Sequence, residues 1–124
     1  MIERFKNCDY PEVAGWYAKR HLKPPPQESL PETGFIWPKV AAAFLYSTDS
    51  DLCLFDGLIT NPKAPLKKRD LAVSALLMAL EKTAVALGFR RIFAFTACHG
   101  VTTKLFSAHF SFWGRYLFYT KELR

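Results

Sequence analysis

The sequence predicts an α/β fold of the α+β kind, in which a mixed sheet carries helices on both faces of a single domain. One continuous segment, residues 58–96, reads as strand, basic turn, long helix, glycine and strand, which is a βαβ unit. Residues 40–60 hold two apolar runs around a polar turn, which indicates an antiparallel hairpin. A chain of 124 residues, half of them hydrophobic, is long enough to form one domain, 1–124, with its own core.

The N-terminal part of the chain predicts a strand followed by a helix. Residues 1–6 alternate loosely between apolar and polar side chains, as a first strand does. Asp9 has the side chain of a helix N-cap, and Pro11 falls in the first turn, where proline is tolerated. Three consecutive prolines at 24–26 must end this helix, and a loop is expected from there to Gly34.

The hairpin is predicted to pair residues 40–46 with residues 52–60 across the polar turn 47–51. Gly57 lies inside the second of these strands. A glycine within a strand indicates a bulge or the close approach of another backbone, because it has no Cβ. We therefore expect irregular pairing at Gly57.

The segment after the hairpin predicts the longest helix, from residue 70 to residue 87. Its apolar spacing predicts an inward face made of Leu71, Ala75, Leu76, Ala79, Leu80, Thr83, Ala84 and Leu87. Gly88 is expected to end the helix as its C′ residue, with Phe89 in the hydrophobic contact that accompanies such an end. Beyond it we expect a buried strand at 92–95, a second helix at 101–108 and one or two closing strands within 110–123.

A run of cations precedes this predicted helix, and its members are Lys63, Lys67, Lys68 and Arg69. The N-terminus of a helix carries unpaired backbone N–H groups and about half a positive charge. The cations and the helix end together predict a site for a phosphate group. The alternative is a solvated basic loop that only caps the helix.

Composition limits the partners and the compartment. The net charge of +6 suits an anionic partner, whether a polyphosphate cofactor, a nucleic acid or an acidic protein surface. The three cysteines lack metal-binding spacing and predict reduced thiols that pack in the core, with no metal site. No apolar run is long enough for a membrane span, and the N-terminus lacks the apolar region of a signal peptide. We therefore expect a cytoplasmic protein that does not enter a membrane.

Two stretches of the chain resemble the GNAT superfamily of N-acyltransferases, which use acetyl-CoA. Residues 86–96, ALGFRRIFAFT, look like the strand that follows the cofactor-binding helix of that family, and residues 40–62 look like its central hairpin. The sequence TNPKAP at residues 60–65, followed by a charged run, is most similar to the corresponding segment of small GNAT-like proteins encoded by bacteriophages. The resemblance is strongest over residues 34–96, and it implies a mixed, mostly antiparallel sheet of about six strands.

The resemblance also implies where CoA would bind. The pantetheine arm would follow the strand residues Leu58, Ile59 and Thr60, where the family has a bulge that separates two neighbouring strands. The pyrophosphate would lie against the start of the helix, at Lys67, Lys68, Arg69, Asp70, Leu71, Ala72, Val73 and Ser74. The family's glycine pair is absent here, because one register puts Leu71 and Val73 at those positions and the next puts Ala72 and Ser74 there.

Two side chains are candidates for the catalytic base that takes a proton from the acceptor amine. Asp56 lies on the central strand just before the expected cofactor position, and His99 follows the last core strand. The tyrosine that protonates the departing thiolate in the family is best matched here by Phe106, which has no hydroxyl. Ser107 and Tyr119 are possible substitutes.

Three functions therefore stay open. The first is an acetyl-CoA-dependent N-acetyltransferase that acts on a primary amine of a small molecule or a protein. The second is a catalytically silent binding protein of the same fold that engages a host protein. The third is a nucleic-acid binder, indicated by basic and aromatic residues that alternate near the C-terminus, at Arg115, Tyr116, Tyr119 and Lys121. The sequence favours the first and makes nucleic acid an unlikely partner, and it leaves a monomer and a homodimer equally open.

Overall fold

A computed structural model describes residues 1–96, 99–116 and 118–123, and for residues 99, 100 and 102 it describes the backbone alone. Its helices are α1 (Tyr10–Lys19), α2 (Leu66–Ala86) and α3 (His99–Ser107), with short 3₁₀ turns at Asn7–Asp9 and Gln27–Ser29. Its strands are β1 (Glu3–Arg4), β2 (Gly34–Trp37), β3 (Ala41–Ser47), β4 (Leu52–Thr60) and β5 (Arg91–Ala94).

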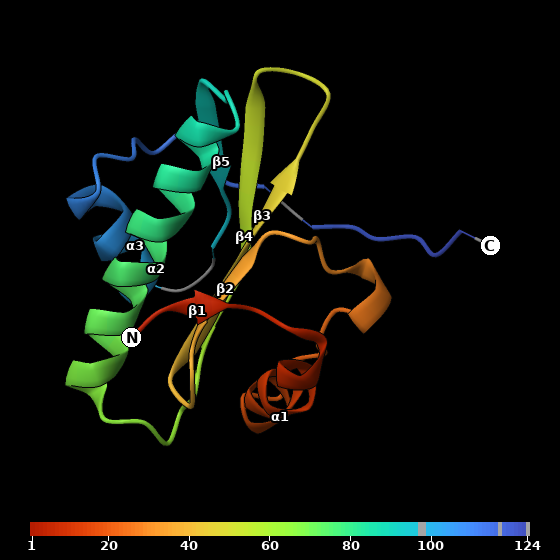
Figure 1. The fold of residues 1–124 in the computed structure, drawn as a ribbon, viewed down its shortest axis with the longest axis vertical. Helices are drawn as coiled ribbons and strands as arrows, with labels where there is room; N and C mark the ends of the chain where they lie inside the picture. The colour runs from red at the N-terminus through yellow and green to blue at the C-terminus, as the bar shows by residue number, and fades with distance from the viewer. Residues whose placement is uncertain (97–98, 117, 124) are drawn as a thin grey trace.

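The strands form one sheet in the order β1-β2-β3-β4-β5 (Figure 1). The first four strands pair antiparallel with their neighbours, and β5 pairs parallel to β4. The parallel pair is joined by the crossover helix α2, as a βαβ unit requires. The mixed, mostly antiparallel sheet is confirmed, with five strands among the described residues instead of the six or so expected.

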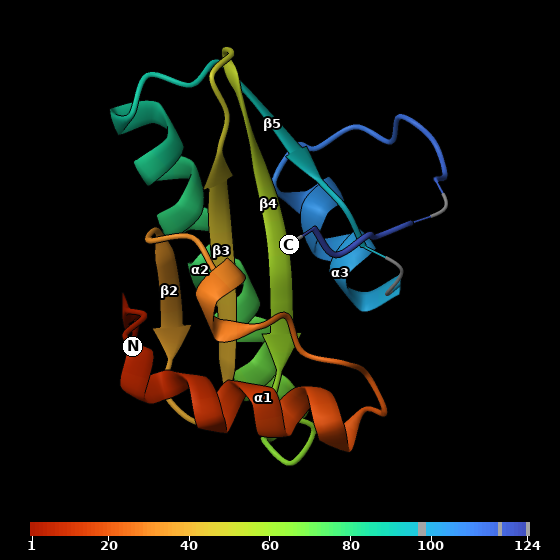
Figure 2. The same ribbon diagram turned by 90° about the vertical axis from the view of Figure 1, so that its right-hand side faces the viewer.

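Helices cover both faces of the sheet, as predicted. On one face α2 packs over the central strands, with α3 beside it near the β5 edge, and on the other face α1 crosses the sheet (Figures 1 and 2). The core under α2 contains Val40, Ala41, Ala43, Leu45, Cys53, Phe55, Ala72, Val73, Leu76, Leu77, Leu80 and Ala84. The smaller core under α1 contains Val13, Trp16, Ile36, Ala42, Phe44 and Ile59. Alternate residues of β3 therefore enter opposite cores, as the pleat of a strand dictates.

The long helix begins earlier than the sequence analysis predicted, at Leu66 instead of residue 70. Pro65 occupies the N-cap position, so the proline starts the helix and the charged run that follows belongs to its first turn. The predicted inward face was also partly wrong, since Leu71 and Leu87 are 61% and 55% exposed. The buried side chains of the helix are Ala72, Val73, Leu76, Leu77, Leu80 and Ala84.

The C-terminal end of α2 has the predicted geometry. Gly88 has a φ of +89°, which is the left-handed conformation that glycine adopts readily. The Gly88 N–H donates to the Val85 carbonyl, and the Phe89 N–H donates to the Ala84 carbonyl. This pair of bonds is a Schellman motif, and Phe89 packs against the α2 core as expected.

The two ends of the chain differ in how well they were predicted. The first strand is short but present, and α1 begins directly after Asp9. Strand β2 was not anticipated, because the sequence analysis expected a loop as far as Gly34 and began the hairpin at residue 40. The closing strands expected in 110–123 are absent from the described part of that segment. Its exposed apolar side chains are Phe112, Trp113, Tyr116, Phe118, Tyr119 and Leu123.

Candidate active site

Strands β4 and β5 separate partway along their length. Their pairing begins at Leu52 with Arg91 and ends at Phe55 with Ala94, although β4 continues to Thr60. On its other side β4 stays paired with β3 through Thr60. The stretch 56–60 therefore has no β5 partner among the described residues, and one backbone edge of β4 is left open beside β5.

The opening coincides with an irregularity in β4. Ala42 pairs with Ile59 and Phe44 pairs with Asp56, so β4 has one more residue than β3 between these pairs. Gly57 lies in this stretch with a φ of +70°. A Cβ at this position would come within 2.9 Å of the Phe44 ring. Both the backbone conformation and the packing therefore require glycine, and the predicted bulge at Gly57 is confirmed.

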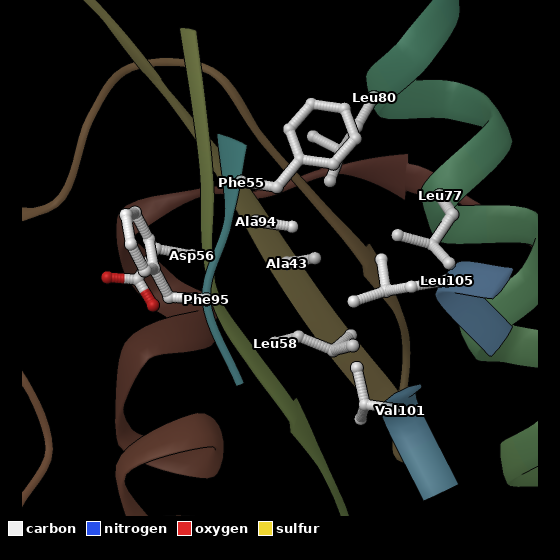
Figure 3. A pocket seen from close by; sticks show the side chains of 10 residues that line it. All are labelled: Ala43, Phe55, Asp56, Leu58, Leu77, Leu80, Ala94, Phe95, Val101 and Leu105. Carbon is white, nitrogen blue, oxygen red and sulfur yellow. The ribbon is translucent and has the colours of Figure 1, made fainter. Parts of the chain in front are cut away.

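A small cavity lies where the two strands separate. It is lined by Ala43, Phe55, Asp56, Leu58, Leu77, Leu80, Ala94, Phe95, Val101 and Leu105. Figure 3 shows the leucines on the α2 side of the strands, with Asp56 and Phe95 together on the opposite side. The cavity holds about 20 Å³, which is room for a single water molecule. A larger ligand would need the lining side chains to move.

Asp56 occupies the α1 side of this opening and is exposed to solvent. One of its oxygens, Oδ1, accepts a hydrogen bond of 2.7 Å from the Gly57 N–H. Burial and then the Asp56 carboxylate raise the pKa of Tyr17 to about 12, and the same two causes raise the pKa of Tyr46. The carboxylate is therefore close enough to act electrostatically on two phenol hydroxyls.

Tyr17 and Tyr46 were missed by the sequence analysis. Tyr46 on β3 is brought beside Asp56 by the pairing of the β3–β4 hairpin. Tyr17 comes from α1, and only the packing of α1 across the sheet brings it to the same place. The available signal was the alternation of β3, which puts Tyr46 on the same face as Phe44.

Lys67, Lys68 and Arg69 lie within the first turn of α2, which corrects their expected place in the preceding loop, whereas Lys63 lies in that loop as predicted. Lys67 and Lys68 are exposed, whereas the Arg69 Nε donates to the Ala64 carbonyl at 3.1 Å. The N-cap Pro65 makes no side-chain capping bond, so the first N–H groups of α2 receive no acceptor from it. The cations and the helix end are therefore combined, although the helix begins about one turn earlier than the sequence suggested.

The remaining residues of the predicted cofactor site divide between surface and core. Asp70, Leu71 and Ser74 are exposed along α2, while Ala72 and Val73 are buried in the core under the helix. Burial keeps these last two side chains from contacting a ligand at the surface. Any anion at this helix end would therefore meet residues of the first turn and not the whole stretch 67–74.

The loop that joins β4 to α2 is organised by Asn61. Its Nδ2 donates to the Lys39 carbonyl at 2.9 Å, and its Oδ1 accepts from the Lys63 N–H at 3.0 Å. Just before it, Arg20 at the end of α1 binds Thr60 twice, with Nε donating to the carbonyl and Nη2 to Oγ1 at 3.1 and 2.6 Å. These bonds fix the end of β4 relative to both neighbouring segments.

The other predicted residues are placed as follows. His99 is the first residue of α3, and its side chain lies outside the described part of the structure. Phe106 is 54% exposed on the same helix. Cys53 is buried in the core as predicted, but Cys8 is exposed, so its expected core role was wrong. Cys98 lies outside the described residues.

Two possible features are absent from the part of the chain that the structure describes. No helix there is long and apolar enough to cross a membrane. No group of three or more His, Cys, Asp or Glu side chains there is arranged to hold a metal ion.

The fold is shared with solved acetyltransferases. An acetyltransferase of Trypanosoma brucei is 11% identical, with a TM-score of 0.65 over 98% of this chain and 99% of that chain. An aminoglycoside acetyltransferase from an uncultured soil metagenomic sample, solved in complex with sisomicin, is 14% identical, with a TM-score of 0.61 over 98% and 96% of the two chains. The Mycobacterium tuberculosis protein Rv2747, solved in complex with CoA, is 18% identical, with a TM-score of 0.66 over 88% and 69%.

Sequence comparison adds nothing to these structural matches, since no family model matches the chain and no curated protein is similar enough to match. At identities below 20% the structural likeness establishes the arrangement of the elements. The overall arrangement of helices and strands is therefore that of a known group of folds. The chain has the GNAT-like acetyltransferase fold, as the resemblance over residues 34–96 predicted.

Proposed function

We propose that the protein is an acetyl-CoA-dependent N-acetyltransferase that acts on a primary amine of a small molecule or a protein. The observation that carries the proposal is the opening where β4 loses its β5 partner, beside the bulge at Gly57. A free strand edge offers backbone N–H and C=O groups to an extended amide chain, as it does to an added strand. The pantetheine arm of CoA is such a chain.

In this proposal the arm follows β4 through its backbone. The Leu58 side chain packs into the α2 core and lines the cavity, whereas the Ile59 side chain packs into the α1 core. Successive residues of a strand direct their backbone groups to opposite edges. The backbone of Asn61 bonds to Val40 on the β3 side, so the backbone of Ile59 also faces β3, and the backbone groups of Leu58 and Thr60 face the opening. The Thr60 carbonyl already accepts a bond from Arg20, which leaves the backbone of Leu58 as the main contact. Entry of the arm requires the α3 side chains Val101 and Leu105 to move, because the cavity they line is small.

The pyrophosphate would bind at the start of α2. Lys67 and Lys68 are exposed there, and the unpaired N–H groups of the first turn point out of the helix end. Arg69 supports the loop by binding the Ala64 carbonyl and is less free to meet a ligand. The proposed anion contacts are therefore Lys67, Lys68 and the backbone beside them.

Asp56 is the proposed base. The acceptor ammonium would first lose one proton through Asp56 to solvent. The amine nitrogen would then attack the thioester carbonyl carbon, form the amide bond and break the C–S bond, and the nitrogen would release its second proton to solvent. CoA would leave as a thiolate, which is a fair leaving group because a free thiol has a pKa of roughly 8.5. Phe106 cannot protonate it, so solvent or another hydroxyl must supply the proton.

A titration of folded protein with acetyl-CoA and with CoA, followed by thermal unfolding, tests this function. A ligand that binds only the folded state raises the apparent stability, by about 2.7 kcal/mol at a hundredfold excess over its dissociation constant. The variant Lys67→Glu/Lys68→Glu should lose most of the shift. The matched variant Lys82→Glu/Arg90→Glu makes the same charge change at exposed sites near the other end of α2 and should keep it.

Equal shifts in both variants would rule out the proposed anion site, and no shift with either ligand would rule out the proposed function.

A second candidate function is favoured by two observations. Phe106 replaces the hydroxyl expected of the family, and the cavity between β4 and β5 is nearly closed. A catalytically silent protein of this fold that engages a host protein would show both, and it would release no thiol with any amine.

A further inference from the structure

Three polar groups from different elements converge on the α1 face beside the opening. Asp56 pairs directly opposite Phe44 in the sheet, and Tyr46 lies two residues further along the same face of β3. Such diagonal neighbours are within reach of an aromatic side chain. The Tyr17 hydroxyl lies 3.8 Å from the position that a Cβ on Gly57 would occupy, next to Asp56. The Asp56 carboxylate and the hydroxyls of Tyr17 and Tyr46 therefore lie close together.

Within the part of the chain that the structure describes, these groups have hydrogen-bonding capacity that no other residue uses. The Asp56 Oδ1 accepts the Gly57 N–H, but within the described part of the structure Oδ2 accepts no hydrogen bond. The hydroxyls of Tyr17 and Tyr46 likewise make no hydrogen bond to described residues, although both side chains are half-buried. Tyr10 is different, because its hydroxyl donates to the Pro25 carbonyl at 2.7 Å. Tyr10 is thus structural, whereas the other two hydroxyls are available.

The local charge around Asp56 also differs in sign from the net charge of the chain. The chain carries a net charge of +6, yet the charged or polar groups that act on the Tyr17 hydroxyl are Asp56, Tyr46 and Tyr10. None of these is a cation. Tyrosines are neutral at physiological pH, and the raised pKa values of these two take them further from ionisation, so the negative charge of Asp56 stands alone among them.

We propose that Asp56, Tyr17 and Tyr46 form the acceptor site and bind the substrate as a primary ammonium ion. This proposal rests on the acetyltransferase function for the identity of the ligand as an acceptor. A primary ammonium has three N–H donors, and the site offers three free acceptors, Oδ2 of Asp56 and the two phenol oxygens. A quaternary ammonium has the charge without the donors, and an alcohol has a donor without the charge.

Direct binding of small probes tests the site without CoA. The probes are propylammonium chloride, tetramethylammonium chloride and 1-propanol at constant ionic strength, and the signals are the ring carbons of labelled tyrosines in NMR spectra. Propylammonium should shift the Tyr17 and Tyr46 signals in a saturable manner. Asp56→Asn should raise its dissociation constant about tenfold or more, and Tyr17→Phe or Tyr46→Phe about threefold each, as expected for charged and neutral hydrogen bonds.

Tyr10→Phe is the matched control, and it should leave propylammonium binding unchanged. Equal binding of tetramethylammonium or 1-propanol, or unchanged binding after Asp56→Asn, would overturn the site. The CoA titration separates the two proposals. If propylammonium binds with this pattern and CoA does not bind, the acetyltransferase function is ruled out and the cation site is supported. If CoA binds and propylammonium does not, the acceptor site alone is ruled out.

Discussion

The face of the sheet under α2 is packed entirely with apolar side chains, whereas the face under α1 combines a smaller apolar cluster with a carboxylate and two phenols. The first face contains most of the buried residues and provides most of the stability. The second contains hydrogen-bonding groups that the described residues leave unused. The difference indicates that the two layers of one small domain have separate tasks, and that substitutions on each face should affect different measurements.

The largest effect on stability should come from the α2 face. Leu80 is completely buried there, so Leu80→Ala removes packed methyl groups and leaves a cavity. We expect a loss of about 2–5 kcal/mol in the free energy of unfolding, measured with denaturant. Met78 on the same helix is 68% exposed, and Met78→Ala should change that free energy by less than about 0.5 kcal/mol. Similar losses in both variants would show that the core is misassigned.

Asp56→Asn should have the opposite pattern, with little effect on stability and a large effect on activity. Because Asp56 is exposed, we expect a change in stability within about 0.5 kcal/mol. If Asp56 is the base, kcat/KM for an amine acceptor should fall about a hundredfold or more at neutral pH, with CoA affinity nearly unchanged. The loss should shrink as the pH approaches the pKa of the amine itself. Normal turnover of the variant at neutral pH would exclude Asp56 as the base.

A comparison of Gly57→Ala with Gly88→Ala tests whether the bulge at Gly57 is needed for stability and for CoA binding. Both glycines have positive φ, so alanine at either costs about 1–2 kcal/mol in backbone strain. Only at Gly57 would the new Cβ also collide with Phe44, since nothing lies within 4 Å at Gly88. Gly57→Ala should therefore be the more destabilising change by denaturant unfolding, and it alone should weaken CoA binding. Equal effects would mean that the close packing at the bulge is unimportant.

The smallest expected effect is in the alkaline titration of Tyr17. Its pKa is raised from about 10 to about 12, so the folded state favours the neutral phenol. The stability that this provides is complete below pH 10 and is lost as the pH rises toward 12. Absorbance titration should show this late ionisation, and Tyr17→Phe should remove it. Asp56→Asn should lower the pKa of Tyr17 only in part, because burial is the larger cause of the shift. An unchanged titration of Tyr17 would show that the Asp56 carboxylate does not act on it.

Much of the fold could be predicted because its signals are local. The βαβ unit, the Schellman end at Gly88 and the bulge at Gly57 each depend on a glycine or a periodic run within a few residues. The start of α2 was misplaced because Lys67, Lys68 and Arg69 were interpreted as a loop, although such residues favour helices. Its inward face was ambiguous because Leu71 is apolar and yet exposed.

The candidate site was predicted only in part, because it depends on contacts between distant segments. Asp56 was recognised from its place on β4, but Tyr17 joins it only through the packing of α1 against the sheet. The alternation in 110–123 suggested closing strands, and alternation by itself does not supply a neighbouring strand. The likeness to bacteriophage proteins and the contribution of His99 stay predictions.

A crystal structure of the protein with acetyl-CoA tests the central claim most directly. The account predicts the pantetheine arm against the open edge of β4 at Leu58, with the pyrophosphate at Lys67 and Lys68 and the thioester near Asp56. It also predicts that Val101 and Leu105 move to enlarge the cavity. Acetyl-CoA bound elsewhere, or β4 paired with β5 as far as Thr60 in the complex, would contradict it.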